Sequence, residues 1–399
     1  MSAETVAIIG AGLTGCLAGL DLSRRNRRVR LIDARPEPVM EASLWNEGKL
    51  HLGYVYAKDA ASRTAQRMIE GSLRFGPLIE PWVGRAELSA MTSLPFSYGV
   101  PEGSMLTPDQ VRAHFAAVAA IGQGHNGWYP GDADPFAWAE LTPGDLAATF
   151  DPDAVRTAFA TSELAIDPHR LAARLREAVQ ADRNIEFQGD CEVVAARAVG
   201  TGYALRYDDG TEETFATVAN CTWRDRLRLD ATLFDTPDRP WLWRYKTAIH
   251  LHNVSGPVPN PATFVLGEYG DFVNFGDGRL YLSWYPACRI GVSRDTAPPD
   301  WSAALDDARR SDIFDTTLAE LTALMPALRD MDLTAAKTEI EGGIIFNWGN
   351  TDIGDPNSET HQRFDVGVRS TGNWHTVDTG KYCLAPLFAR ELADRIAPQ

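Results

Sequence analysis

The stretch that decides the fold is Thr5-Val6-Ala7-Ile8-Ile9-Gly10-Ala11-Gly12-Leu13-Thr14-Gly15, close to the start of a chain of 399 residues. Thr5–Ile9 is a short apolar run that predicts a buried strand, and the residues after it, Gly15–Arg25, predict a helix. A second strand is expected over Val29–Asp33. A strand, a glycine-rich turn, a helix and a second strand in this order predict a Rossmann-like unit that binds a dinucleotide.

Each glycine of the turn has a physical role in such a unit. Gly10 permits the tight turn, Gly12 lets backbone amides approach a pyrophosphate, and Gly15 lets the helix pack closely on the strand. The pyrophosphate rests on the helix N-terminus, where free N–H groups favour an anion. Asp33 ends the second strand, 23 residues after Gly10, where a carboxylate accepts hydrogen bonds from ribose hydroxyls. These residues alone fit NAD as well as FAD.

Elements of the α/β kind return twice later in the chain. Asp167–Ala181 predicts a helix with Asp167 as its N-cap, and the segments that follow it predict several short strands. The β-rich segments lie between, including a hairpin over 271–285. We therefore expect an α/β fold with two domains. A discontinuous Rossmann-like domain covers 1–90, 160–235 and 350–399, and a second, β-sheet-based domain for the substrate covers 91–159 and 236–349.

Composition limits the class of protein. Fifty-four acidic against 38 basic residues give a formal charge of −16, which disfavours a nucleic-acid partner. The five cysteines form no C-x-x-C pair, which favours reduced thiols in a cytoplasm over disulfides or zinc. No run of 18 apolar residues predicts a membrane span. We expect a cytoplasmic protein with no metal and no membrane partner; the sequence leaves the oligomeric state open.

A second stretch points to a family. Ser43-Leu44-Trp45-Asn46-Glu47-Gly48-Lys49-Leu50-His51-Leu52-Gly53-Tyr54 resembles the flavin-contacting loop of the D-amino-acid oxidase-like FAD-dependent oxidoreductases, in the variant of the L-2-hydroxyglutarate and glycerol-3-phosphate dehydrogenase branches. The stretches 163–168, 217–223 and 372–382 resemble the same family. The family's more usual Ala-Gly after Asn220 is replaced by Cys221-Thr222-Trp223, which bears on the subfamily rather than on the cofactor.

The resemblance implies FAD as the cofactor. The final helix, expected from Lys381, would point its N-terminal amides at the flavin C2 carbonyl, where negative charge collects on reduction. The residues expected to bind FAD are Gly10, Gly12, Leu13, Thr14, Gly15, Asp33, Ala34, Trp45, Asn46, Glu47, Gly48, Lys49, Leu50, Val193, Thr222, Trp223, Thr379, Gly380, Lys381 and Tyr382.

Three residues are candidates for catalysis: Lys49, His51 and Tyr285. Lys49 and His51 lie two residues apart on the loop, so an extended backbone turns both side chains the same way. Lys49 would place a positive charge where oxygen meets the flavin, and His51 would accept a substrate proton. The plainer alternatives are an ion pair for Lys49 and a core hydrogen bond for His51. Tyr285 would face the substrate from a strand unless it packs in the core.

Basic residues of the second domain are candidates to clamp a substrate carboxylate, although a surface position is the simpler interpretation of each: Arg244, Lys246, Arg289 and Arg294. The segment 358–363 is interpreted as an ordinary loop.

The resulting hypothesis is an oxidase of a small amine or amino-acid-like substrate that passes hydride to flavin N5 and is reoxidised by oxygen. The alternatives are a 2-hydroxy acid dehydrogenase that uses another electron acceptor, and a tailoring oxidoreductase of a biosynthetic pathway. A flavoprotein whose flavin is structural is a further alternative, from a different class.

Overall fold

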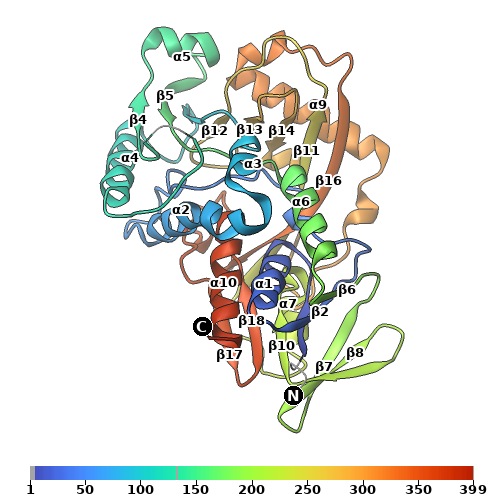
Figure 1. Ribbon diagram of the computed structural model, residues 1–399. Helices are drawn as coiled ribbons and strands as arrows, with labels where there is room; N and C mark the ends of the chain where they lie inside the picture. The colour runs from blue at the N-terminus through green and yellow to red at the C-terminus, as the bar shows by residue number, and fades with distance from the viewer. Residues whose placement is uncertain (1–4, 132–133, 399) are drawn as a thin grey trace.

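A computed structural model describes residues 5–131 and 134–398. It contains a six-stranded sheet, a nine-stranded sheet and a small three-stranded sheet (Figure 1). The six-stranded sheet has the order β17 (Gly367–Thr371), β18 (Trp374–Asp378), β10 (Thr217–Asn220), β1 (Thr5–Ile9), β2 (Arg28–Ile32) and β6 (Ile185–Gln188). All of its neighbouring strands are parallel except the β17–β18 pair.

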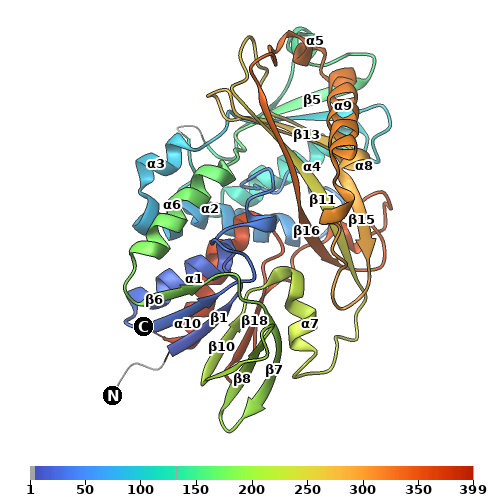
Figure 2. The ribbon, with the colours of Figure 1, turned by 90° about the vertical axis from the view of Figure 1, so that its right-hand side faces the viewer.

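Strand β1 shows how the sequence builds this layer. Ile8 joins the core cluster formed with the helices, whereas Ala7 and Ile9 join the cluster formed with the small sheet. This alternation is the period-two pattern of a strand that is buried on both faces. The helices of the first face are α1 (Leu13–Arg24), α10 (Ala385–Ile396), α6 (Pro168–Ala181) and α2 (Arg63–Val83). The small sheet is β7 (Val193–Val199), β8 (Gly202–Tyr207) and β9 (Glu212–Phe215), seen on the opposite side in Figure 2.

The nine-stranded sheet forms the other half of the molecule (Figure 2). Its order is β15 (Arg289–Ser293), β11 (Trp241–His252), β14 (Leu280–Trp284), β13 (Gly270–Asn274), β12 (Ala262–Phe264), β3 (Ser97–Pro101), β5 (Val155–Thr161) and β4 (Trp138–Glu140), and β16 (Lys337–Trp348) also pairs with β11. The remaining helices are α3 (Arg85–Ala90), α4 (Pro108–Gly122), α5 (Pro143–Thr149), α7 (Arg226–Asp230), α8 (Tyr285–Cys288) and α9 (Asp307–Leu324). The predicted fold class is confirmed.

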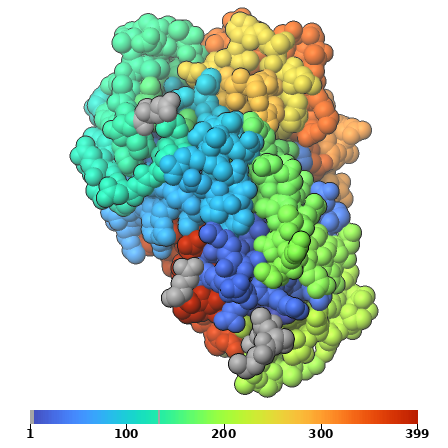
Figure 3. All heavy atoms as spheres, viewed as in Figure 1, coloured from blue at the N-terminus to red at the C-terminus, as the bar shows by residue number. Residues whose placement is uncertain are grey.

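The division into two domains stays a prediction. The strands of the six-stranded sheet all fall within 1–90, 160–235 and 350–399, and those of the nine-stranded sheet fall within 91–159 and 236–349 except that β5 extends to Thr161. In Figure 3 the beginning and the end of the chain share the lower part of the surface, and helices α1 and α10 are in contact.

Helix α2 contains two prolines, because it runs from Arg63 to Val83 through Pro77 and Pro81. The buried residues Phe75, Ile79 and Val83 recur every four residues, so burial of one face sustains the helix across both prolines.

Helix α10 begins at Ala385 rather than at Lys381, because a 3₁₀ turn over Tyr382–Leu384 precedes it. The predicted strand over 280–285 ends at Trp284, and Tyr285 begins the short helix α8, with Pro286 in its first turn. In the described ranges, no helix is both long and apolar enough to cross a membrane. All five cysteines are free and buried.

Candidate cofactor and active site

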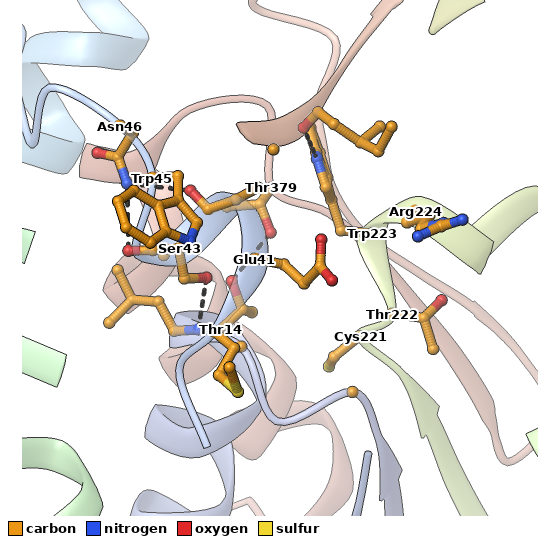
Figure 4. A pocket seen from close by; sticks show the side chains of 18 of the residues that line it. Thr14, Glu41, Ser43, Trp45, Asn46, Cys221, Thr222, Trp223, Arg224 and Thr379 are labelled. Carbon is orange, nitrogen blue, oxygen red and sulfur yellow. Dashed lines mark hydrogen bonds between the residues drawn. The ribbon is translucent and has the colours of Figure 1, made fainter. Parts of the chain in front are cut away.

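A cavity of about 510 Å³ lies between the two large sheets. Figure 4 shows side chains of the segment 41–46 on one side of it and those of 221–224 on the other. Its size is in the range of ligand-binding pockets. The predicted site residues that line it are Gly10, Gly12, Leu13, Thr14, Asp33, Ala34, Trp45, Asn46, Glu47, Lys49, His51, Val193, Thr222, Trp223, Thr379, Gly380, Lys381 and Tyr382.

The glycine turn at one end of the cavity has no room for side chains where the backbone packs. Gly10 has φ +97°, and a Cβ there would lie 2.6 Å from the carbonyl oxygen of Cys221. A Cβ on Gly15 would lie 1.9 Å from the carbonyl oxygen of Gly10, so Gly15 packs the helix on the turn and does not line the cavity. Gly12 differs, because its Cβ would meet only Ser43 Oγ, at 3.1 Å. Its open side therefore faces the cavity.

Asp33 is fixed by backbone amides at the same end. Its Oδ2 accepts a hydrogen bond of 2.6 Å from the amide of Ala11, and its Oδ1 accepts one of 2.8 Å from the amide of Arg35. Burial raises the pKa of Asp33, and these amides oppose the rise. Each carboxylate oxygen keeps a second lone pair for a ligand hydroxyl. The turn, the start of α1 and Asp33 thus fit the nucleotide half of a dinucleotide.

The loop after Ser43 is held by its own backbone and by the segment 164–166. Asn46 Oδ1 accepts a 2.7 Å hydrogen bond from the amide of Gly48. A Cβ on Gly48 would lie 1.8 Å from the carbonyl oxygen of Ile166, and the amide of Leu50 donates to the carbonyl of Leu164. Gly48 and Leu50 therefore anchor the loop and do not line the cavity. The alternate residues between and beside them face it.

Lys49 carries a charge that is already paired. Its ammonium group donates to Thr263 Oγ1 and, at 2.9 Å, to Asp271 Oδ1, and it lies 4.2 Å from the centre of the Phe96 ring. Only 2% of the residue is exposed. The structure thus contains the plainer alternative for Lys49, which is an ion pair, here with Asp271.

Three other cations line the same end of the cavity: Lys246, Arg363 and Lys381. Among the described residues, none of them has an Asp or Glu oxygen within 4.0 Å. Lys246 Nζ lies 3.1 Å from Ser283 Oγ and 3.3 Å from Tyr281 Oη, and Arg363 donates to the carbonyls of Thr360 and Phe346. This part of the cavity is positive although the whole chain is strongly acidic.

Glu47 is the carboxylate that faces these cations. Burial would raise its pKa, but Lys381, Lys246 and Lys49 outweigh burial and lower the pKa to about 2. Glu47 is therefore ionised at neutral pH and can accept hydrogen bonds there.

Burial also lowers the pKa of Lys381 to about 8, against the pull of Glu47. This predicts a pH effect on stability. Between pH 8 and the ordinary lysine pKa of 10.5, the unfolded chain holds a proton on Lys381 that the folded chain has lost, so the free energy of unfolding rises with pH. Urea unfolding of the ligand-free protein, compared with Lys381→Met, should show the wild type gaining up to about 3 kcal/mol over this window. A constant difference between the two proteins would contradict the prediction.

His51 is neutral in the folded protein. Burial, followed by the charges of Lys381 and Lys49, holds its pKa well below the ordinary value. Its Nε2 lies 3.8 Å from Glu47 Oε1 and its Nδ1 lies 3.8 Å from Glu163 Oε1. A neutral imidazole that lines a cavity is suited to accept a proton.

The structure does not bring every candidate to the cavity. Tyr285 was expected to face it from a strand; instead Tyr285 lies on α8 and its hydroxyl is bonded to Arg244 and Asp352. Arg244, Arg289 and Arg294 also lie outside the lining. Arg244 and Arg289 are paired with Asp352, and Arg294 donates to the carbonyl of Asn350.

Other lining residues escaped the sequence analysis. Arg363 belongs to the segment interpreted as an ordinary loop, yet it is buried and lines the cavity. Tyr281 was predicted on the right strand, and strand alternation from Ser283 could have placed it next to Lys246. Ser43 Oγ accepts a hydrogen bond from the amide of Leu13 at the start of α1, and no local pattern indicates that contact.

A family model described as FAD dependent oxidoreductase (DAO) matches residues 5–395. The chain therefore belongs to this family of FAD-dependent oxidoreductases, and FAD is its cofactor. A search of curated proteins found no match.

Solved structures with the same fold are distant in sequence. Glycine oxidase from Geobacillus kaustophilus is 16% identical with a TM-score of 0.67, over 99% of this chain and 95% of the other. Dithionite-reduced L-alpha-glycerophosphate oxidase from Mycoplasma pneumoniae with FAD bound is 14% identical with a TM-score of 0.71, over 99% and 95%. Iminodiacetate oxidase from Chelativorans sp. BNC1 is 16% identical with a TM-score of 0.65, over 98% and 94%. At these identities the likeness shows the fold alone.

Proposed function

We propose that this FAD-dependent oxidoreductase oxidises a small anionic substrate at a carbon that carries an amine, with oxygen as the electron acceptor. The observation that carries the proposal is the group of three cations, Lys246, Arg363 and Lys381, that line the cavity without a carboxylate within 4.0 Å among the described residues. When bound, FAD supplies the acceptor for the two electrons. The side chains bind the substrate and take up its proton.

The charge of each side chain decides which group of the substrate it would contact. Lys246 and Arg363 would bind the anionic group of the substrate, Lys246 as a point charge and Arg363 as a planar fork. The ionised Glu47 would accept a hydrogen bond from the protonated amine, and His51, neutral and buried, would take up one proton of that ammonium group. The product is an imine, and oxygen is reduced to peroxide.

A dehydrogenase of a 2-hydroxy acid is the second candidate function. It is favoured by the carboxylate of Glu163 behind His51, since a hydroxyl group holds its proton more tightly than a protonated amine and needs a stronger acceptor. In that case Glu47 would bind the hydroxyl, and an acceptor other than oxygen would take the electrons.

One experiment separates these functions. The yellow holoenzyme is mixed without air with amino acids and with matched 2-hydroxy acids, and loss of the flavin absorbance at its visible maximum is followed. Bleaching by amino acids and rapid return of colour in air support the oxidase. Bleaching only by hydroxy acids, with colour restored by a quinone but not by air, would replace the first proposal with the second.

A prediction follows for Lys246. Lys246→Met removes one of the unpaired charges and keeps the length of the stem, so the substrate concentration for half-maximal bleaching should rise about tenfold, a loss of about 1.4 kcal/mol. Lys337→Met is the matched control, because the Lys337 side chain is 69% exposed and lies on the distant end of β16. Equal half-maximal concentrations in all three proteins would show that Lys246 does not bind the anion.

A further inference from the structure

Behind His51 lies a carboxylate that the proposed reaction leaves unexplained. Glu163 follows β5 and is fully buried, with 0% exposure. Its Oε2 accepts a 2.6 Å hydrogen bond from the amide of Leu52, and its Oε1 accepts one from the hydroxyl of Tyr98. A buried carboxylate costs free energy that an amide or an apolar side chain would avoid. Two hydrogen bonds do not by themselves explain why an acid occupies this position.

The ring of His51 supplies the missing partner. Its Nδ1 is buried and makes no hydrogen bond in the described part of the chain, and Glu163 Oε1 lies 3.8 Å from it. The backbone on both sides of the ring is fixed: the carbonyl of His51 accepts a 2.7 Å hydrogen bond from Ser72, and the next amide is the one that Glu163 holds. A small rotation of the ring therefore brings Nδ1–H onto Glu163 without moving the loop.

A proton on Nδ1 would leave the free nitrogen toward the cavity. The imidazole would then have its lone pair on Nε2, which lies at the lining of the cavity, 3.8 Å from Glu47 Oε1. A base whose second nitrogen is held by a carboxylate keeps one tautomer and one orientation.

The charges around the ring single out Glu163 as the partner of Nδ1. The groups that face His51 are three cations, Lys49, Lys381 and Arg363, and three carboxylates, Asp271, Glu47 and Glu163. Asp271 is already paired with Lys49, and Glu47 lies on the Nε2 side of the ring. Glu163 is therefore the carboxylate beside Nδ1, and Lys49 favours its charged form against the burial that raises its pKa.

We propose that Glu163 is a positioning residue, which holds His51 in the Nδ1–H tautomer and stabilises the imidazolium that forms when His51 takes a proton from the substrate. In that step the N–H or O–H bond of the substrate breaks, an Nε2–H bond forms, and the electron pair stays on the substrate's heteroatom. The kinetic part of this proposal rests on the proposed function, whereas the tautomer of His51 is a property of the holoenzyme without substrate.

The test uses Glu163→Gln, which keeps the shape and removes the charge, beside Tyr98→Phe, which removes the other partner of Oε1 and keeps the carboxylate. Anaerobic reduction by substrate should slow by about 10- to 100-fold in Glu163→Gln, with little change in half-saturating substrate concentration. The acid limb of its pH–rate profile should move to lower pH, because the imidazolium loses its counter-charge. Tyr98→Phe should lose less than about threefold and keep the wild-type profile. Equal losses and unchanged profiles in both variants would mean that Glu163 only supports the local structure, and would overturn the proposal.

A second measurement needs no substrate. Holoenzyme labelled with ¹⁵N-histidine, with His51 assigned through His51→Asn, should give the signal of an Nδ1–H tautomer in the wild type and lose it in Glu163→Gln. An Nε2–H tautomer in the wild type overturns the proposal even if the variant does not fold. If no amine or hydroxy acid reduces the enzyme while the tautomer is the expected one, the proposed function fails and the role of Glu163 stands.

Discussion

Gly12→Val protein is expected to be purified colourless, while the wild type is yellow. Gly12 has room toward the cavity, and its Cβ would meet only Ser43 Oγ. Two further methyl groups would fill the space that the pyrophosphate of FAD needs at the start of α1. Overpacking of this kind costs about 1–3 kcal/mol, and lost amide contacts to an anion add to it. We expect at least about a hundredfold weaker binding, measured by titrating the apoprotein with FAD.

Gly144→Val is the control for this experiment. Gly144 is exposed on α5 and does not line the cavity. A Cβ added there would have only Thr142 Oγ1 within 4 Å, at 3.9 Å. Circular dichroism must show that Gly12→Val keeps its secondary structure. A folded, yellow Gly12→Val protein with wild-type affinity would mean that this turn does not hold the pyrophosphate.

The second large effect is expected at Lys49, and it concerns stability. Lys49→Met leaves Asp271, whose side chain is 20% exposed, without its ion-pair partner, and removal of one member of a buried pair costs up to about 3–5 kcal/mol. The free energy of unfolding should fall by that amount in urea titrations. The earlier expectation that the Lys49 charge speeds the reaction with oxygen remains a prediction, but in this variant it can be measured only on the fraction that folds.

The double variant Lys49→Met, Asp271→Asn distinguishes the contribution of the ion pair to stability from that of the other contacts of Lys49. Removing both charges should restore most of the lost stability, to within about 1.5 kcal/mol of the wild type, because no buried charge is left unpaired. If the double variant is as unstable as Lys49→Met, the contact of the Lys49 ammonium group with the Phe96 ring contributes more than the ion pair.

The parts of the fold that the sequence revealed are those built from local patterns. The glycine spacing at Gly10, Gly12 and Gly15, the alternation along β1 and the N-cap at Asp167 each occupy a few consecutive residues. The predicted hairpin is also present, as the antiparallel pair of β13 and β14. In each case the backbone conformation is decided by neighbours in the chain, so the printed sequence carries the information.

The pairing inside the site could not be predicted in this way. Lys49 and Asp271 are 222 positions apart, and nothing near either residue indicates the other. Arg363 lies in a segment without regular periodicity, and its burial depends on carbonyl groups of Thr360 and Phe346. Tyr285 was misplaced because the strand pattern continues through it, whereas Pro286 and the contact with Asp352 favour a helical turn. Long-range contacts decide these positions.

The order of strands in the six-stranded sheet has a consequence for how the protein is made. Strand β1 is made before the other strands of this sheet, but its neighbour β10 begins at residue 217 and the next strand, β18, at residue 374. At a synthesis rate of about 5–20 residues per second, β10 follows β1 after about 10–40 s. Strand β18 follows after about 20–75 s. The lining residues Thr379 to Tyr382 arrive later still. The nascent chain therefore carries an incomplete six-stranded sheet until Asp378 has been made, and the cavity lacks part of its lining until Tyr382 has followed.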